Sequence, residues 1–383
     1  MFQPRLRIVK VEIAPLSVPL LEPFVIATGR VDVTRAAEVK VTLLDERTGR
    51  TTWGLGEGAA LWPVTTEDQP DVLLALDQAT NRLSGMHLRL PDADGDAPID
   101  LQSLAELAAL LDDAFPTSPV ARAAFETALC DAWARRLGLP LRTLLGGPIG
   151  AATRRLDTDI TIPISEPSHM AKQARAWAEQ GFTHFKIKVG KDLDADVAAL
   201  HAIFSAVPTA RFRIDANAGF SAAEAIALVQ AIEAQKMIVE CFEQPCAADD
   251  LEAMALVTAT VDIPVIADES VKCLADLERV IAARAADGVN LKLVKSGGPL
   301  GCLAIGRAAK ERGMPLMIGG MVETRLGMTA AAHVAAALGG VEFVDLDTAW
   351  LLARDPYEGR GYMAKGPRYE LPDEPGLGLN AAT

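Results

Sequence analysis

Lysines and carboxylates stand at the ends of successive apolar segments in the second half of the chain. Lys188 ends one segment and Lys292 another, and three acids end the segments between them, Asp215, Glu243 and Asp268. Three buried carboxylates close together need a cation, and oxygen-only ligands favour a hard divalent ion such as Mg²⁺. A lysine on each side of a metal-held carboxylate can remove and return a proton at the adjacent carbon. The set predicts proton transfer at a carbon acid.

Lys186 precedes Lys188 by two residues, so on a strand both side chains point to the same face. Two ammonium groups that close repel each other, which predicts a depressed pKa for at least one of them and a lysine that can act as a general base. The Lys-x-Lys pattern also fits a solvated strand end, and the three acids also fit caps of the following helices. The regular succession of the segments favours the catalytic interpretation.

The spacing of these segments predicts the fold that brings them together. They end, 24 to 28 residues apart, at Lys188, Asp215, Glu243, Asp268, Lys292, Gly320 and Asp345. That is the length of one strand plus one helix, and parallel strands closed into a barrel place such ends around one mouth. We therefore predict an α/β barrel in which the second strand, ending at Lys188, lies nearly across from the sixth, ending at Lys292.

The first part of the chain follows another pattern. Residues 6–15 and 37–44 alternate as antiparallel strands do, and the segment between them predicts a hairpin or mobile loop. Gly-rich residues 54–68 predict a second loop, and amphipathic helices follow. The Pro- and Gly-rich sequence after Trp350 is expected to pack back on this part. We predict three units: a capping domain over 1–136, a barrel over 137–350 and a C-terminal segment over 351–383.

Composition narrows the class of protein. The chain has 383 residues, half of them apolar, which fits a barrel with an accessory domain. Its 37 basic and 51 acidic side chains give a net charge of -14, so we expect neither nucleic acid nor an anionic membrane as a partner. No apolar run is long enough for a membrane helix, and the first residues alternate like a strand. Five cysteines without a C-x-x-C motif predict buried thiols in the cytoplasm.

Together the motifs resemble the enolase superfamily, and within it the muconate-lactonizing-enzyme subgroup. In chain order they are FVIATG, GLGEG, KIKVG, DANAG, EQP, ADES and NLKLVKSGG. The resemblance implies a modified TIM barrel, (β/α)7β, closed by an N-terminal α+β capping domain that the C-terminal tail completes. It also implies one Mg²⁺ per subunit. The implied roles are Asp215, Glu243 and Asp268 as metal ligands, Lys188 and Lys292 as the acid–base pair, Lys186 at the substrate carboxylate, and Asn217 and Lys295 in support.

The segment DLDT places Asp345 and Asp347 in phase, which predicts two inward carboxylates that bind a cation away from the metal. It resembles the Asp-x-Asp signature of dipeptide epimerases such as L-Ala-D/L-Glu epimerases, where the pair binds the ammonium group of the substrate. That resemblance also implies that Thr161 and the backbone at Gly320 line the dipeptide and that Glu323 is a supporting carboxylate. A motif this short fits a helix N-cap as well.

Residue 29 departs from that pattern. Epimerases of this kind that act on Ala-Glu carry an arginine in the capping loop, and Gly29 stands at the corresponding position. A glycine leaves room for a bulky group, so we predict a hydrophobic or aromatic residue at the second position of the dipeptide. Arg30 is adjacent and would undo this inference if it swung inward.

The predicted function is an Mg²⁺-dependent epimerase that moves a proton at the α-carbon of the C-terminal residue of an L,L-dipeptide, in a homo-oligomer. Muconate cycloisomerase and o-succinylbenzoate synthase stay alternatives, although their substrates lack an ammonium group for Asp345 and Asp347. A catalytically idle carboxylate-binding protein would need neither Lys188 nor Lys292. The seventh strand, PLMIGG, ends without the histidine of other superfamily branches, and His333 is expected to be a structural residue in a helix.

Overall fold

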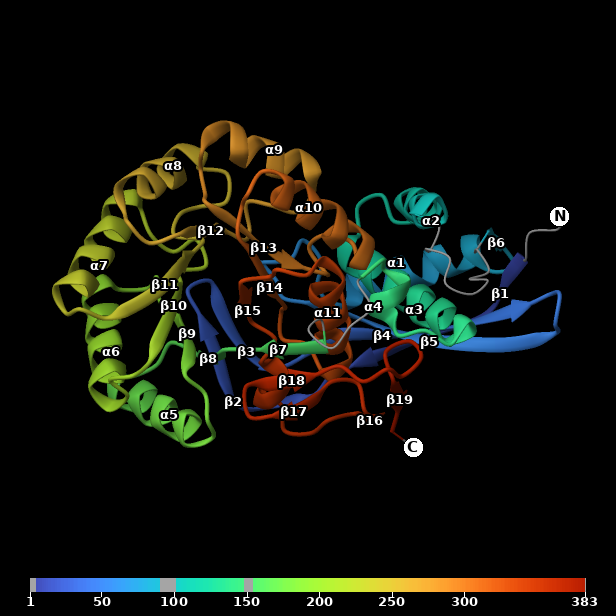
Figure 1. Cartoon of the computed structure of the whole chain (residues 1–383), viewed down its shortest axis with the longest axis horizontal. Coiled ribbons are helices and arrows are strands. Elements are labelled where there is room, and N and C mark those ends of the chain that lie inside the picture. The colour runs from blue at the N-terminus through green and yellow to red at the C-terminus, as the bar shows by residue number, and fades with distance from the viewer. Residues whose placement is uncertain (1–4, 90–100, 148–153, 383) are drawn as a thin grey trace.

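The computed structural model describes residues 5–89, 101–147 and 154–382. It has two layers: a barrel of parallel strands ringed by helices, and an antiparallel sheet with its own helices beside the barrel (Figure 1). The predicted fold class, a modified TIM barrel with an N-terminal α+β capping domain, is confirmed. None of the helices in the described ranges is both long and apolar enough to cross a membrane.

The capping domain is built on a four-stranded antiparallel sheet in the order β5-β4-β1-β6. Its strands are β1 (Arg5–Leu16), β4 (Arg35–Asp45), β5 (Arg50–Ala60) and β6 (His87–Arg89). The strands predicted at 6–15 and 37–44 are confirmed, because β1 and β4 pair along their lengths. The segment between them forms the predicted hairpin, from β2 (Pro19–Ile26) and β3 (Gly29–Val33).

The loop predicted at residues 54–68 is wrong for its first part, which belongs to strand β5. The glycines are needed because helix α3 (Pro119–Leu137) packs directly on this strand. A Cβ atom on Gly58 would lie 2.6 Å from the backbone oxygen of Val120, and Gly54 and Gly56 also face the α3 backbone. Glycine inside a strand commonly marks such a close approach of another backbone.

Two further helices complete the capping domain, α1 (Gln69–Leu83) and α2 (Leu101–Ala114). Helix α1 begins with a capping box. The Asp68 side chain accepts from the backbone N–H of Asp71, and the Asp71 side chain accepts from the backbone N–H of Asp68. Helix α3 ends at Gly138, whose φ of 68° is the left-handed conformation that terminates many helices.

Eight parallel strands form the barrel in chain order. They are β8 (Ile160–Ile162), β9 (His184–Lys188), β10 (Arg211–Asp215), β11 (Ile238–Glu243), β12 (Val265–Ala267), β13 (Gly288–Lys292), β14 (Leu316–Gly319) and β15 (Phe343–Val344). Strands β9 and β13 are four positions apart and lie on opposite sides. Where the first and last strands meet, Asp159 N donates to Val344 O at 3.0 Å.

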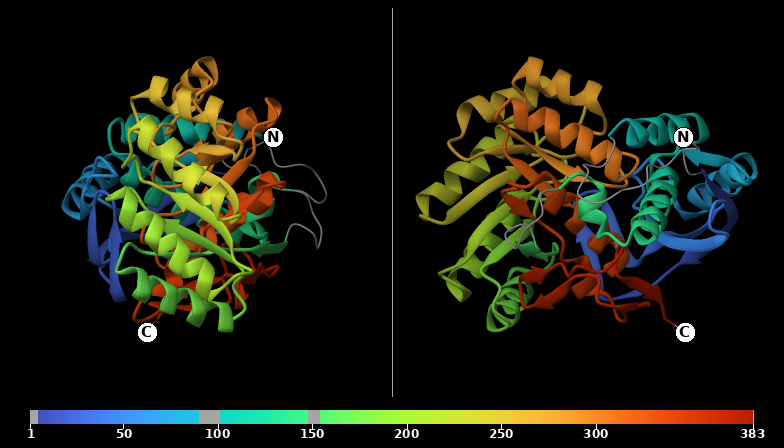
Figure 2. Two further views of the ribbon diagram at one scale, coloured as in Figure 1. Left: turned by 90° about the vertical axis from the view of Figure 1, so that its left-hand side faces the viewer. Right: turned by 45° about the vertical axis from the view of Figure 1, so that its right-hand side comes forward.

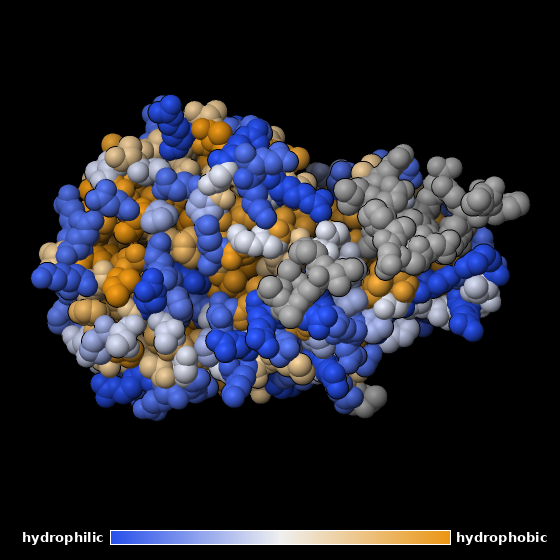
Figure 3. All heavy atoms as spheres, in the orientation of Figure 1, coloured by the Kyte–Doolittle hydropathy of each residue, from blue (hydrophilic) through white to orange (hydrophobic). Residues whose placement is uncertain are grey.

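Helices connect the strands and lie side by side around the outside of the barrel (Figure 2). They are α5 (Pro167–Glu179), α6 (Leu193–Ala206), α7 (Ala222–Ala234), α8 (Leu251–Thr260), α9 (Leu274–Ala283), α10 (Pro299–Glu311) and α11 (Arg325–Leu338), and the short α4 (Leu141–Leu144) precedes the barrel. On the face in Figure 3, hydrophilic side chains are spread over these outer helices, with hydrophobic ones between them. The apolar sides of the helices pack inward against the strands.

The C-terminal segment contacts both layers. It follows η2 (Thr348–Leu351) and contains β16 (Tyr357–Gly359), β17 (Met363–Lys365), β18 (Arg368–Glu370) and β19 (Leu379–Ala381). Strand β18 pairs with β7 (Arg155–Asp157). Leu377 N donates to Asp131 of the capping domain at 2.7 Å. Tyr369 OH donates to Leu346 O of the barrel at 2.9 Å. The segment therefore bridges the two layers.

Two buried carboxylates of the capping domain accept hydrogen bonds from the N-termini of barrel helices. Glu57 on β5 accepts from Thr324 N at 2.9 Å and from Gly327 N at 3.0 Å, at the start of α11. Glu126 on α3 accepts from Leu300 N at 2.7 Å, at the start of α10. The first amides of a helix have no partner within it, and its dipole attracts a negative charge there. These two contacts fix the capping domain over the barrel mouth.

Candidate active site

The predicted strand-end residues converge at one mouth of the barrel. Strand register pairs Lys188 on β9 with Asp215 on β10, and Asp215 with Glu243 on β11. Asp268 directly follows β12, and Lys292 ends β13. Because the carboxyl ends of parallel strands meet at the same mouth, the five side chains share one buried site. Each of these residues is at most 6 % exposed.

Each of the two lysines proposed as bases lies against a carboxylate. Lys188 Nζ is 2.6 Å from Asp215 Oδ2, and Lys292 Nζ is 2.7 Å from Asp268 Oδ2. Strands β9 and β13 stand on opposite sides of the barrel, so the two ammonium groups enter the mouth from opposite directions. A planar carbon acid between them would have one lysine on each face.

Lys186 occupies the centre of the charged cluster. Its Nζ lies 3.1 Å from Asp215, 2.7 Å from Glu243 and 2.7 Å from Asp345. Burial lowers the pKa of this ammonium, but the surrounding carboxylates outweigh burial and hold the pKa well above its ordinary value. The same balance, with Asp268 as the main partner, raises the pKa of Lys292. The predicted depression of a lysine pKa is therefore wrong for Lys186, because carboxylates outnumber the ammonium groups around it.

Asn217 and Lys295, two of the predicted supporting residues, each contact a strand-end carboxylate. Asn217 N donates to Asp215 Oδ1 at 2.9 Å, from a backbone with a φ of 42° that asparagine tolerates better than most residues. Lys295 Nζ donates to the backbone oxygen of Asp268 at 2.6 Å and also to its carboxylate. The two contacts fix the orientation of these acids.

Gln244 and Asn290 also contact strand-end acids, and these roles were not predicted from the sequence. Gln244 Oε1 accepts from Asp268 N at 2.8 Å, so the glutamine of EQP positions the next strand end. Asn290 Nδ2 donates to Glu243 Oε1 at 2.7 Å. Asn290 is two residues before Lys292 and so shares its face, a signal that could have found it.

Asp345 and Asp347 lie beside this cluster at the end of β15. Asp345 accepts from Lys186, and Asp347 Oδ2 accepts from the backbone N–H of Thr161 on β8. Burial, followed by the charge of Asp345, raises the pKa of Asp347 to about 7. Asp347 precedes η2 but makes no side-chain cap hydrogen bond, which disfavours the helix-cap interpretation of the motif.

A small cavity connects these groups. Its volume is about 30 Å³, close to the space of one water molecule. Its polar lining contains Thr161, Lys186, Lys188, Asn217, Lys292, Gly320, Asp345, Asp347 and Thr348. Its apolar lining comes from Phe24, Ile26, Leu61, Val64, Met321 and Val322. The charged groups therefore face an apolar wall.

Glu323 lies behind the cavity rather than on its lining. Its Oε1 accepts from Met321 N at 2.9 Å, and a Cβ on Gly320 would lie 3.0 Å from the same oxygen. Burial, followed by the charge of Glu57, raises the pKa of Glu323 to about 8. The carboxylate thus shapes the loop that carries Gly320.

Gly29 lies at the start of β3, in the hairpin above the mouth. Nothing stands within 4 Å of a Cβ built there, so the position has room for a side chain. Arg30 pairs with Asp32 at 2.8 Å, and both side chains are about 60 % exposed. Arg30 therefore points to solvent and does not replace the arginine that is missing at position 29.

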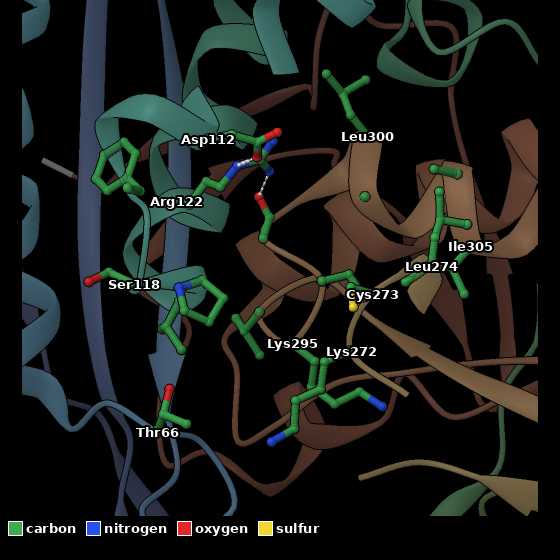
Figure 4. A pocket seen from close by; sticks show the side chains of 18 of the residues that line it. Thr66, Asp112, Ser118, Arg122, Lys272, Cys273, Leu274, Lys295, Leu300 and Ile305 are labelled. Carbon is green, nitrogen blue, oxygen red and sulfur yellow. Dashed lines mark hydrogen bonds and ion pairs between the residues drawn. The ribbon is translucent and has the colours of Figure 1, made fainter. Parts of the chain in front are cut away.

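A larger cavity, of about 680 Å³, lies between the capping domain and helices α9 and α10 (Figure 4). Much of its lining is apolar, including Leu274, Leu300 and Ile305. Arg122 on its wall is already paired with Asp112 at 3.0 Å. Lys295 borders it, but neither Lys188 nor Lys292 does. The groups that can do chemistry belong to the smaller cavity.

The sequence matches known proteins along nearly its whole length. The family model described as "Enolase C-terminal domain-like" matches residues 169–382, which is more than half of the chain. The chain belongs to this enolase-like family.

Relatives within the enolase-like family are named as epimerases. An "L-Ala-D/L-amino acid epimerase" of Populus trichocarpa is 38% identical and covers 96% of this chain and 83% of its own. An "Aromatic dipeptide epimerase" of Herpetosiphon aurantiacus is 36% identical, covering 96% and 97%. An "L-Ala-D/L-Glu epimerase" of Bacillus subtilis is 34% identical, covering 98% of both.

One solved structure that is similar to this chain contains a metal ion and a dipeptide. A dipeptide epimerase from Enterococcus faecalis, complexed with Mg and the dipeptide L-Leu-L-Tyr, superposes with a TM-score of 0.85. It is 32% identical in sequence, and the match covers 98% of this chain and 99% of the other. That relative thus holds a metal and a dipeptide within a fold similar to that of this chain.

The carboxylates of this enolase-like chain fit such an ion chemically. Burial, followed by the charge of Asp215, raises the pKa of Glu243 to about 8, so its charged form needs a further cation. Glu243 Oε2 accepts no hydrogen bond from the described residues, although Lys186 Nζ is 2.7 Å away. In the described ranges, the acids whose oxygens all lie within 4.8 Å of one another are a different set, Asp159, Asp345 and Asp347. Around Asp215, Glu243 and Asp268, lysine ammonium groups occupy the positions next to the carboxylate oxygens. A divalent ion bound to these oxygens would replace those ammonium groups.

His333 has the structural role predicted for it in this enolase-like barrel. It lies in α11, is buried, and its Nδ1 accepts from Arg142 N at 3.0 Å. Burial, followed by the charge of Arg142, lowers its pKa to about 3. A histidine that stays neutral and hydrogen-bonded so far from the mouth takes no part in proton transfer.

Proposed function

We propose that this chain is an Mg²⁺-dependent dipeptide epimerase that moves a proton at the α-carbon of the C-terminal residue. One observation carries the proposal. Two buried lysines, Lys188 and Lys292, enter one small cavity from opposite sides of the barrel, next to the carboxylate pair of Asp345 and Asp347. Proton removal on one face and return on the other inverts the configuration, and a carboxylate pair suits the free ammonium group of a dipeptide.

Lys188 and Lys292 are the acid–base pair. One of them removes the α-proton of a given epimer, and the other donates a proton to the opposite face. Their pairing with Asp215 and Asp268 positions each Nζ in the mouth. A bound cation that took over the charge of Asp268 would weaken the ion pair that raises the pKa of Lys292, which favours a lysine able to accept a proton.

Asp215, Glu243 and Asp268 are the metal ligands, with Asn217 and Lys295 supporting them. Their oxygen-only donor set suits Mg²⁺. When bound, the ion withdraws charge from the substrate carboxylate and so makes the neighbouring α-proton more acidic. The complex of the Enterococcus faecalis relative with Mg and a dipeptide supports this assignment.

The remaining residues hold the substrate. Asp345 and Asp347 bind the ammonium group, Lys186 lies at the substrate carboxylate, and Thr161 and the Gly320 backbone line the dipeptide. The contact of Thr161 with Asp347 and the place of all five on the cavity lining support these roles. Glu323 supports the loop at Gly320.

The second residue of the dipeptide is hydrophobic or aromatic. Phe24, Ile26 and Val322 are part of an apolar wall of the cavity, and Gly29 contributes no charge there. A glutamate side chain against that wall would lose its hydration without gaining a partner. The relative named for aromatic dipeptides and the complex with L-Leu-L-Tyr agree with this preference, whereas the Bacillus subtilis relative is named for Ala-Glu.

The two alternative reactions fit less well. Muconate cycloisomerase and o-succinylbenzoate synthase would use the same lysines and metal ligands. Their substrates carry no ammonium group, so Asp345 and Asp347 would remain two buried acids without a ligand. The acid pair is the feature that favours the epimerase.

We also propose the domain division at residues 136 and 350, a homo-oligomeric state and a cytoplasmic location. Helix α3 packs on strands β4 and β5 of the capping sheet and ends at Leu137, which supports a division next to that residue. All five cysteines are free, as expected for a reducing compartment, and four of them are buried. The prediction of a buried thiol is wrong for Cys273, which is exposed. Oligomers are common among enzymes of this size, and light scattering would measure the state.

The test is proton NMR in D₂O with Mg²⁺, on a panel of L,L-dipeptides that varies each position separately. We expect loss of the α-proton signal of the C-terminal residue together with the appearance of a diastereomer. Dipeptides with hydrophobic second residues should exchange fastest. Absence of exchange across the panel would contradict the epimerase, and Ala-Glu as the best substrate would contradict the specificity.

A further inference from the structure

Asp159 is a fully buried acid that the proposed reaction does not use. It directly precedes β8 and lies two residues before Thr161, so the two side chains share the inner face of the barrel. Thr161 lines the small cavity and Asp159 does not. Asp159 is therefore one layer deeper in the barrel, beneath the substrate.

This carboxylate faces the acid pair at the end of β15. Oxygen atoms of Asp159, Asp345 and Asp347 all lie within 4.8 Å of one another. Asp159 Oδ1 and Asp347 Oδ1 accept no hydrogen bond from any described residue, and both side chains are fully buried. A buried carboxylate oxygen without a hydrogen-bond donor costs folding free energy, so a ligand that brings a donor to this cluster would be favoured.

The cations around the cluster do not balance it. Arg213 Nη1 donates to Asp159 Oδ2 at 2.8 Å, but the same guanidinium also binds Glu240 at 3.1 Å. Lys186 binds Asp345 at 2.7 Å, and it also serves Glu243 and Asp215 of the proposed metal site. Three carboxylates thus share two cations that also bind acids outside the cluster. Burial, followed by the charge of Asp345, raises the pKa of Asp159 well above its ordinary value, so its charged form needs a further cation in the cavity above it.

The position of Asp159 is fixed relative to the acid pair. Its N–H donates to Val344 O at 3.0 Å, and Arg213 Nη1 donates to the same oxygen at 2.8 Å. Val344 directly precedes Asp345, so Asp159 and the acid pair are held together across the join between the first and last strands. The charge of Asp159 therefore acts on Asp345 and Asp347 at a constant distance.

We propose that Asp159 is a specificity-determining residue that acts through Asp345 and Asp347, so that the site selects a substrate with a free primary ammonium group. This inference rests on the proposed function and deepens it. In a low-dielectric interior the field of a third carboxylate strengthens the attraction for a cation in the cavity. A neutral N-acylated dipeptide gains nothing from that field. Asp159 does not line the cavity and acts on the substrate only through Asp345 and Asp347, as a positioning residue.

The test compares a dipeptide with its N-acetyl derivative in Asp159→Asn. We would measure KM and kcat for L-Ala-L-Phe with Mg²⁺ present, and the Ki of N-acetyl-L-Ala-L-Phe against it. We expect KM to rise about tenfold, equivalent to about 1.4 kcal/mol, with kcat and Ki nearly unchanged. The matched control is Glu240→Gln, which removes the other carboxylate partner of Arg213 and should leave the ratio of Ki to KM as in the wild type.

The other outcomes separate the possible failures. Equal shifts of KM and Ki with a reduced kcat would show that Asp159 is merely structural and would overturn the inference. A wild-type enzyme that fails to epimerise L-Ala-L-Phe would instead contradict the proposed function. Should Asp159→Asn fold poorly, the double variant Asp159→Asn/Arg213→Gln removes the whole ion pair, and the same rise in KM is expected.

Discussion

Lys188 Nζ lies 2.6 Å from Asp215 Oδ2, and the two residues are register partners on neighbouring strands. A proposed base and a proposed metal ligand are thus in direct contact. An ion bound to Asp215 would compete with the ammonium group for the same oxygen. Binding of a metal at Asp215 would therefore change the position of the Lys188 ammonium group.

The first prediction concerns the metal. Addition of Mg²⁺ should raise the Tm, since a ligand that binds the folded state at 100 times its Kd adds about 2.7 kcal/mol. Asp268→Asn should abolish this rise, whereas Glu240→Gln should keep it. EDTA should stop epimerisation and Mg²⁺ should restore it. A Tm that does not respond to Mg²⁺ in the wild type would contradict the metal site.

The second prediction concerns the two lysines. Lys188→Ala and Lys292→Ala should each lower epimerisation about 10³-fold. Each variant keeps one base, so it should still exchange the α-proton of one epimer with D₂O and retain its configuration. The two variants should exchange opposite epimers, and NMR on the separate L,L and L,D dipeptides would assign the lysines. Exchange of the same epimer by both variants would rule out the two-base arrangement.

The third prediction concerns the ammonium site. Asp347→Asn keeps the shape of the side chain and its ability to accept from Thr161 N, but removes the charge. We expect KM for dipeptides to rise about 10- to 100-fold with a smaller change in kcat. Steady-state kinetics measure this directly. A change confined to kcat would place Asp347 in proton transfer instead.

The fourth prediction concerns Gly29. Gly29→Arg should be tolerated, because nothing lies within 4 Å of a Cβ there and the backbone is not in the left-handed region. The new guanidinium should raise kcat/KM for Ala-Glu relative to Ala-Phe by about tenfold. Gly29→Gln is the uncharged control of similar length. An unchanged ratio would mean that residue 29 does not face the second side chain.

The fifth prediction concerns pH and stability. Burial raises the pKa of Glu126 to about 7. A carboxyl group with a raised pKa stabilises the fold fully below its unfolded pKa of about 4.5, and this contribution is lost as the pH rises through 7. The free energy of unfolding should therefore fall less for Glu126→Gln than for the wild type between pH 5 and 8. Urea unfolding at each pH measures this difference. If the stability of the two proteins changed equally with pH, ionisation of Glu126 would not destabilise the fold, which would contradict the prediction.

The barrel and its charged mouth could be predicted from the sequence because both follow local rules. Strand and helix lengths repeat, so the ends of the strands fall at a regular spacing, and register then places Lys188 beside Asp215. Alternation within a strand places Lys186 on the same face as Lys188. These relations need no knowledge of distant contacts.

The missed features depend on contacts between distant parts of the chain. Glu57 is 267 residues from Thr324, whose backbone it binds, and no spacing rule joins them. Gly54, Gly56 and Gly58 look like a loop until helix α3 is known to lie against them. The lysine pKa values depend on how many carboxylates surround each ammonium group, which a single strand does not reveal.

The apolar wall of the cavity has a consequence for how such an enzyme can diverge. Phe24 and Ile26 come from the capping hairpin, whereas both lysines come from barrel strands. After gene duplication, substitutions in the hairpin can change which dipeptide fits while the inherited chemistry stays intact. New substrate ranges are then reachable through substitutions that leave both lysines and their strands unchanged.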